Sequence, residues 1–161
     1  MEGMVTKDQS TEFWHHRPVL VTGGAGFIGS WLCHDLIKLG AKTIILDIKK
    51  EMPSLGKEPD SILSNAVYLH GNILNKKLLE KILKKFKIET VFHLAAEAIV
   101  GEAKNNPEKA FDVNVKGTWQ VLSAFRNIND TRGQIVVASS YKAYGTHDSL
   151  PYKENYALLG E

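Results

Sequence analysis

The stretch Pro18–Gly29 reads PVLVTGGAGFIG and decides the fold. Its apolar first five residues predict a buried parallel strand, and the glycines that follow predict a tight turn into a helix. Gly24, Gly26 and Gly29 fall at that turn, where glycine allows the chain to turn sharply and to approach a pyrophosphate closely. Free amides at the start of the helix would bind the phosphates. No lysine follows Gly29, so the pattern excludes a P-loop nucleotide triphosphatase.

The rest of the chain alternates apolar runs with helical patterns. We expect strands at 18–22, 43–47, 67–70, 90–94 and 134–139, and helices at 28–40, 75–87 and 107–127. Such an alternation indicates βαβ units. The prediction is an α/β fold, a Rossmann-type doubly wound parallel sheet with helices on both faces. Residues 1–17 are polar and without period, so we expect a flexible N-terminal arm that touches a domain at 18–161 through Phe13 and Trp14.

Two of the expected helices carry an apolar stripe that predicts their buried face. In the first helix the stripe is Ile28, Leu32, Leu36 and Leu39, with Gly40 as the expected stop. In the last helix it is Phe111, Val115, Thr118, Leu122 and Phe125.

Asp47 closes the second expected strand. A carboxylate there can accept hydrogen bonds from the adenosine ribose hydroxyls and repels the 2′-phosphate of NADP. Together with the glycine turn, Asp47 therefore predicts NAD as the cofactor.

The composition excludes several other classes of protein. The 161 residues contain 20 basic and 18 acidic side chains, a balance that gives no reason to expect a nucleic-acid partner. Cys33 is the single cysteine, and the six histidines are mostly scattered without metal-ligand spacing, so neither a disulfide nor a metal site is expected. No apolar run is long enough to span a membrane and the N-terminus has no signal-peptide core. We therefore expect a cytoplasmic protein with no membrane partner.

Three further motifs follow the glycine turn in a characteristic order: HLAAE at 93–97, NVKGT at 114–118 and SSYKAYG at 139–145. With TGGAGFIG they resemble the extended short-chain dehydrogenase/reductase family, which comprises nucleotide-sugar epimerases and dehydratases. AIVGEAKNNP and KAYG…LPYKENYAL resemble its CDP-glucose 4,6-dehydratase branch most. The resemblance implies carbohydrate biosynthesis, with a CDP-glucose-like nucleotide sugar as substrate.

The resemblance also implies where NAD binds. The glycine turn would hold the pyrophosphate and Asp47 the ribose, while Asn72 and Ile73 would flank the adenine. The family usually has Asp in place of Asn72, although an amide oxygen can also accept from the adenine amine. The implied cofactor residues are Gly23, Gly26, Phe27, Ile28, Gly29, Asp47, Asn72, Ile73, Leu94, Ala95, Ala96, Asn114 and Ser139.

Two of the motif residues suit structural roles on their own chemistry. Asn114 is a poor helix former inside an expected helix, so we expect its side chain to brace neighbouring strand-end backbone. We expect His93, at a strand end, to be packed in the fold and not to act as an acid or base.

The implied catalytic residues are Ser140, Tyr141 and Lys142. A dehydratase of this kind oxidises the sugar at C4, loses water across C5 and C6, and returns the hydride to C6. Ser140 matches the hydroxyl that binds the C4 oxygen, and Lys142 matches a lysine of the CDP-glucose branch. Tyr141 departs from the family, because dehydratases carry there an Asp that protonates the C6 hydroxyl.

The oxidation base of the family, the tyrosine of a Y-x-x-x-K pair, has no match here, because neither Tyr152 nor Tyr156 is followed by lysine at the fourth position. We expect the pair, a further strand and the substrate domain to lie beyond Glu161, so that the chain is an N-terminal fragment and inactive alone. The oligomeric state stays open, with a homodimer of the complete protein as one option. Three readings stay open: a 4,6-dehydratase fragment, an NAD-dependent nucleotide-sugar epimerase or reductase, and a non-catalytic dinucleotide-binding module.

Overall fold

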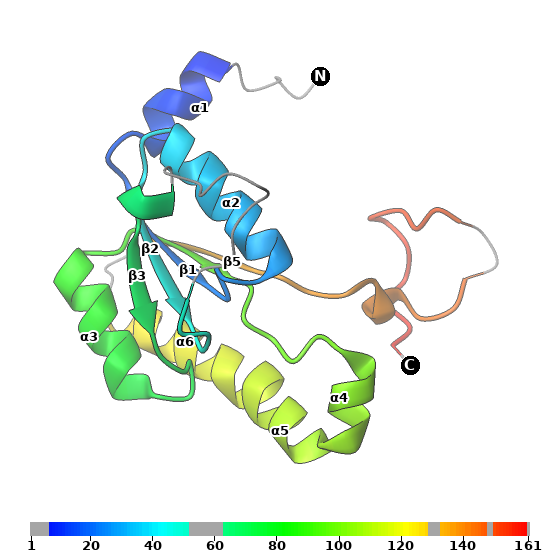
Figure 1. The fold of residues 1–161 in the computed structure, drawn as a ribbon. Helices are drawn as coiled ribbons and strands as arrows, with labels where there is room; N and C mark the ends of the chain where they lie inside the picture. The colour runs from blue at the N-terminus through cyan, green and yellow to red at the C-terminus, as the bar shows by residue number, and fades with distance from the viewer. Residues whose placement is uncertain (1–6, 52–62, 129–132, 148–149, 161) are drawn as a thin grey trace.

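Five parallel strands form one sheet in the computed structural model, which describes residues 7–51, 63–128, 133–147 and 150–160 (Figure 1). Their order across the sheet is β3-β2-β1-β4-β5. The strands are β1 (Pro18–Thr22), β2 (Lys42–Asp47), β3 (Val67–His70), β4 (Thr90–His93) and β5 (Gln134–Val137). β2 and β3 are added on one side of β1, and β4 and β5 on its other side, so the strand order changes direction at β1. The predicted Rossmann-type parallel sheet is confirmed.

Alternate residues of the strands supply two cores, one on each face of the sheet. Leu20 packs against α3 (Lys76–Phe86) and α6 (Thr118–Arg126) on one face. Val19 and Val21 pack against α2 (Phe27–Lys38) on the other. Helices therefore cover both faces, as Figure 1 shows.

The remaining elements are short. They are α1 (Lys7–Trp14), η1 (Leu63–Asn65), α4 (Val100–Asn105), α5 (Pro107–Phe111), η2 (Asp112–Gly117) and η3 (Tyr141–Tyr144). Sequence periodicity had no signal for α4. In the described residues no helix has the length and apolar character needed to cross a membrane.

The N-terminal segment differs from the expected arm. Residues from Lys7 form the helix α1, and Trp14 at its end packs on the α2 side of the sheet with its ring 5.8 Å from that of Phe92. The Arg17 guanidinium lies 4.0 Å from the centre of the Phe13 ring. The expected contact through aromatic side chains is present, but it is made by a helix.

Both predicted apolar stripes were wrong in part. Ile28 is 70% exposed, and α2 buries a different set of residues: Gly29, Ser30, Cys33, His34 and Leu36. Phe111 and Val115 are exposed, and α6 buries Val121, Ala124 and Phe125. Small residues allow the helix backbones to approach the sheet closely. The face that carries them is therefore buried, although it is not the most apolar face of the helix. The helix stop at Gly40 is confirmed by its φ of +83°.

The expected helix 107–127 is interrupted at its centre. η2 is a π-helical segment between α5 and α6, and Asn106 caps α5 by accepting a hydrogen bond from the Lys109 amide. Inserted π turns are frequent at functional sites. Here η2 contains Asn114.

Candidate dinucleotide site

The carboxyl ends of parallel strands meet at one edge of the sheet, and the predicted cofactor residues follow those ends. The glycine turn follows β1, Asp47 ends β2, Asn72 follows β3, and Leu94–Ala96 follow β4. The change of direction between β1 and β4 lies in the middle of this edge, where folds of this class bind ligands.

The glycine turn is shaped for close contacts. Gly23 has a φ of +72°, and a Cβ there would lie 2.7 Å from the Ala95 amide nitrogen. A Cβ on Gly29 would collide with the Gly23 carbonyl oxygen. The N-cap of α2 is Gly26, which has no side chain to cap the amides of the first turn. This arrangement fits a pyrophosphate, because backbone amides and the helix dipole both favour an anion.

Asp47 is tied to the glycine turn. Its Oδ2 accepts a hydrogen bond from the Ala25 amide at 2.9 Å, and its Oδ1 accepts one from the Lys49 amide at 2.9 Å. The Lys49 ammonium donates to the Ala25 carbonyl at 2.9 Å. These bonds fix the carboxylate at the end of β2, and each oxygen keeps a lone pair for a ribose hydroxyl.

Cys33 lies on α2 near Asp47. Burial, and secondly the charge of Asp47, raise the pKa of the Cys33 thiol to about 12. The thiol therefore stays protonated and chemically inert at neutral pH. In the part of the chain that the structure describes, no group of three or more histidine, cysteine or acidic side chains could hold a metal ion.

The two predicted adenine contacts differ in what they offer. The Asn72 Oδ1 accepts a hydrogen bond from the Leu74 amide at 2.9 Å, so its amide has a fixed orientation. The Ile73 side chain is 4% exposed and packs in the core beside Gly117. The backbone of Ile73, and not its buried side chain, is therefore what could flank a base.

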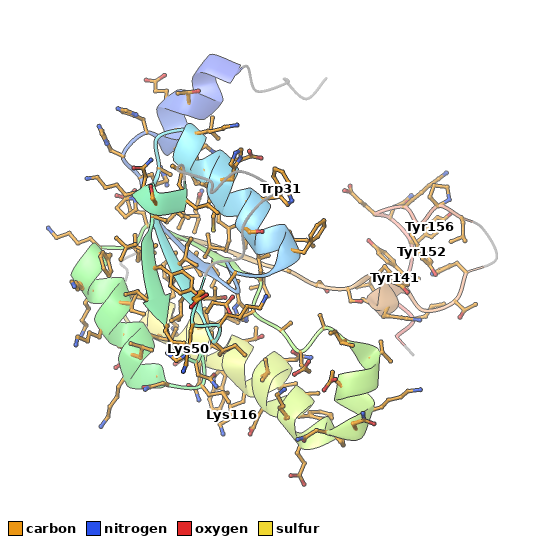
Figure 2. All side chains as sticks on the ribbon, in the orientation of Figure 1. Trp31, Lys50, Lys116, Tyr141, Tyr152 and Tyr156 are labelled. Atoms are coloured by element: carbon orange, nitrogen blue, oxygen red, sulfur yellow. The ribbon has the colours of Figure 1, made fainter. Side chains whose placement is uncertain are left out.

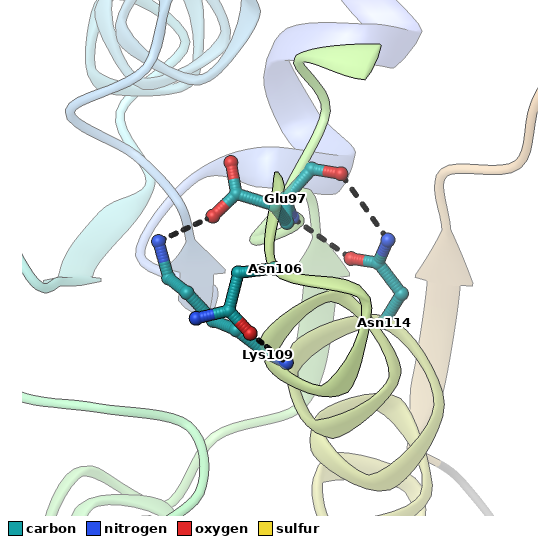
Figure 3. Close-up of polar contacts among 4 residues, drawn as sticks. All are labelled: Glu97, Asn106, Lys109 and Asn114. Carbon is teal, nitrogen blue, oxygen red and sulfur yellow. Dashed lines mark hydrogen bonds and ion pairs between the residues drawn. The ribbon is translucent and has the colours of Figure 1, made fainter. Parts of the chain in front are cut away.

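Asn114 braces the loop after β4, as predicted (Figure 3). Its Oδ1 accepts from the Glu97 amide at 2.8 Å and its Nδ2 donates to the Glu97 carbonyl at 3.2 Å. The Lys109 ammonium lies 2.6 Å from the Glu97 carboxylate, and this hydrogen bond raises the pKa of Lys109. The loop after β4 is thus joined to η2 through Asn114 and to α5 through Lys109. The ion pair was missed because Glu97 and Lys109 show no helical spacing.

His93 is packed as expected and is 2% exposed. Its ring nitrogens contact the hydroxyls of Thr22 and Thr118. Neither threonine was predicted to contact His93. Thr118 was expected only as part of a buried stripe, although it stands four residues after Asn114, the spacing at which a hydroxyl reaches back to a helical carbonyl.

The predicted catalytic residues follow β5, which ends at the same carboxyl edge beside β4. Ser139 and Ser140 follow β5, and the Ser140 hydroxyl accepts a hydrogen bond from the Lys142 amide at 3.2 Å. Tyr141 is 61% exposed and stacks on Tyr152, with ring centres 6.1 Å apart. Figure 2 shows both tyrosines beyond the end of the sheet, well separated from Trp31 on α2. The tyrosine pair thus lies beyond the sheet, whereas Ser139 and Ser140 follow directly on its carboxyl edge.

Comparison with known proteins decides the family. The sequence profile of the GDP-mannose 4,6 dehydratase family matches residues 20–159. The chain belongs to this family. The resemblance to nucleotide-sugar epimerases and dehydratases is therefore confirmed.

Two curated relatives and one solved structure illustrate the match. UDP-glucose 4-epimerase of Halalkalibacterium halodurans is 35% identical over 137 residues, which are 85% of this chain and 39% of that protein. CDP-paratose 2-epimerase of Salmonella typhi is 31% identical, over 84% of this chain and 40% of that protein. The crystal structure of UDP-glucose 4-epimerase from Brucella ovis in complex with NAD has a TM-score of 0.75 and 32% identity, over 90% of this chain and 42% of that one. The chain thus spans about two fifths of the length of these family members.

Proposed function

We propose that the chain is the NAD-binding part of an enzyme that oxidises and reduces a nucleotide sugar at C4. The observation that carries this proposal is the fixed Asp47 carboxylate beside the uncapped start of α2. Together they offer acceptors for a ribose and donors for a pyrophosphate, the two polar parts of a dinucleotide. The related epimerase of known structure that was crystallised with NAD supports the same cofactor.

The cofactor preference tests this proposal. A 2′-phosphate about 4 Å from Asp47 would be repelled by roughly 4 kcal/mol at an effective dielectric constant of 20, reduced by solvent and by Lys49 and Lys50. We expect NADH to bind at least tenfold more tightly than NADPH in a fluorescence titration. Equal affinities would contradict the assignment of Asp47 to the ribose.

NAD, when bound, supplies the hydride acceptor for a C4 hydroxyl. In the proposal Ser140 binds the C4 oxygen, with Tyr141 and Lys142 beside it. The oxidation base is not supplied by these residues, because Tyr141 and Lys142 are adjacent in sequence and no tyrosine in the 161 residues is followed by lysine at the fourth position.

We therefore propose that these 161 residues alone do not turn over a nucleotide sugar. Loss of a general base costs typically 10²–10⁴-fold in rate, and loss of substrate positioning costs more. Incubation with NAD and either UDP-glucose or CDP-glucose should give no NADH absorbance at 340 nm and no keto sugar. Formation of either at the rate of a longer family member would contradict this.

Two reactions compete for the finer assignment. A 4-epimerase is favoured by Tyr141, because a phenol of pKa ~10 is a weak proton donor for loss of the C6 hydroxyl. A 4,6-dehydratase, with CDP-glucose as substrate, is favoured by the CDP-glucose-type motifs and by Lys142. A fusion of residues 1–161 to the C-terminal segment of the Halalkalibacterium epimerase separates them by product: a C4 epimer or a 4-keto-6-deoxy sugar.

A homodimer is the proposed assembly of the complete protein. Phe111, Val115 and Trp119 are 69%, 60% and 69% exposed and follow one another at steps of four residues through α5, η2 and α6. Three exposed apolar side chains within nine residues offer a surface that a second copy of the chain would cover. We expect Trp119→Glu to turn a dimeric fusion protein into a monomer in sedimentation measurements, and a monomeric unsubstituted protein would contradict the proposal.

A further inference from the structure

The inference concerns the buried ring of His93, which ends β4 beside the last residue of β1. Its Nδ1 lies 2.7 Å from the Thr22 hydroxyl oxygen, and its Nε2 lies 3.0 Å from the Thr118 hydroxyl oxygen. Both nitrogens of a 2% exposed ring are thus hydrogen-bonded to neutral side chains from two different elements.

The direction of these bonds follows from the proton count. The Thr118 hydroxyl donates its single proton to the Asn114 carbonyl oxygen, 2.7 Å away. It must therefore accept from His93, so Nε2 carries the ring proton. The lone pair on Nδ1 then accepts from the Thr22 hydroxyl, whose oxygen also receives the Ala95 amide at 3.5 Å. Burial lowers the pKa of His93 and so favours the same neutral ring.

The two ends of this hydrogen-bond chain lie at the candidate dinucleotide site. Thr22 directly precedes Gly23, which rests on the Ala95 backbone. Asn114 holds both backbone groups of Glu97 in the loop after β4. The ring therefore connects the glycine turn, through η2, to the loop that faces it.

We propose that His93, as the neutral Nε2-protonated tautomer, is a positioning residue that holds the glycine turn against the 94–97 loop and so sets dinucleotide affinity. The effect on affinity rests on the proposed NAD binding. The tautomer itself does not, because it follows from Thr22, Thr118 and the Asn114 carbonyl alone. His93 acts through the backbone at both ends and does not touch the cofactor.

The first test measures the tautomer of His93 in the unsubstituted chain. Long-range ¹H–¹⁵N spectra of the 161-residue chain, with His93 assigned by its loss in His93→Gln, should show a protonated Nε2 and an unprotonated Nδ1 at neutral pH. A protonated Nδ1, or fast exchange between tautomers, would overturn the proposal.

The second test measures NADH affinity. Thr118→Val removes the acceptor for the Nε2 proton and should weaken NADH binding about tenfold and alter the His93 signals, whereas Thr118→Ser, which keeps the hydroxyl, should restore both. Thr90→Val is the matched control, because Thr90 is a buried threonine of β4 whose hydroxyl has no partner in the described structure. Unchanged affinity in Thr118→Val would overturn the positioning role alone. A wild-type chain that binds no NADH would overturn the proposed function and with it the role in affinity.

Discussion

Asp47 combines two tasks at the end of β2, since it accepts two backbone amides and is the proposed ribose acceptor. Asp47→Asn places an NH₂ group against one of those amides. Hydrogen bonds to charged groups contribute about 1.5–3 kcal/mol each, so we expect the free energy of unfolding to fall by about 2 kcal/mol and NADH affinity to fall at least tenfold. Urea denaturation and fluorescence titration measure the two. Asp35→Asn, at an exposed carboxylate on α2, should change neither, and full NADH affinity in Asp47→Asn would remove Asp47 from the site.

Thr43 and Thr22 are both buried threonines, but only Thr22 has a partner for its hydroxyl in the described structure. Replacing an unpaired buried hydroxyl by a methyl group of the same shape removes a desolvation cost. We expect Thr43→Val to raise the free energy of unfolding by about 1 kcal/mol and Thr22→Val to lower it by about 1–3 kcal/mol. Urea denaturation compares the two, and a destabilising Thr43→Val would show that the hydroxyl has a partner after all.

Because the pKa of His93 is lowered in the folded chain, the free energy of unfolding should decrease at acidic pH. Below pH ~6.5 the unfolded chain takes up a proton at this ring, while the folded chain resists it. The free energy of unfolding should therefore fall as the pH drops below about 6.5, until the lower pKa of the folded state is passed. His93→Gln should show a shallower slope in denaturation curves across this range. Equal slopes would mean that His93 titrates alike in both states.

At the scale of elements, each strand was predicted to within two residues because buried parallel strands read as unbroken apolar runs. The three expected helices were located, but the buried faces of α2 and α6 were predicted only in part. Periodicity assumes a regular helix packed through its large side chains, whereas α2 approaches the sheet through Gly29 and Ser30, and η2 changes the phase between α5 and α6. The cofactor edge was predictable because its residues directly follow strands that can be located from sequence. The Glu97–Lys109 pair was not, because it depends on how α4 and α5 pack.

The turn between β1 and α2 should tolerate no side chain at Gly23. Gly23→Ala places a Cβ 2.7 Å from the Ala95 backbone at a φ of +72°, where an L-residue costs about 1–2 kcal/mol before any collision. We expect a loss of at least 2 kcal/mol in the free energy of unfolding and no detectable NADH binding. Gly101→Ala is the control, because a Cβ on α4 there meets nothing and alanine favours the helix by about 1 kcal/mol. A fully stable Gly23→Ala that binds NADH would show that the turn is not constrained as described.

For the whole molecule, the central claim is that the carboxyl edge of the sheet is a dinucleotide site assembled from four separate segments. The most direct measurement is the change in backbone ¹H–¹⁵N chemical shifts of the 161-residue chain as NADH is added. We predict that the largest changes fall together at 23–30, 47–49, 72–74 and 94–97, with β5 and the tyrosines at 141–156 little affected. Changes confined to the tyrosine segment, or spread without focus over the surface, would contradict the account.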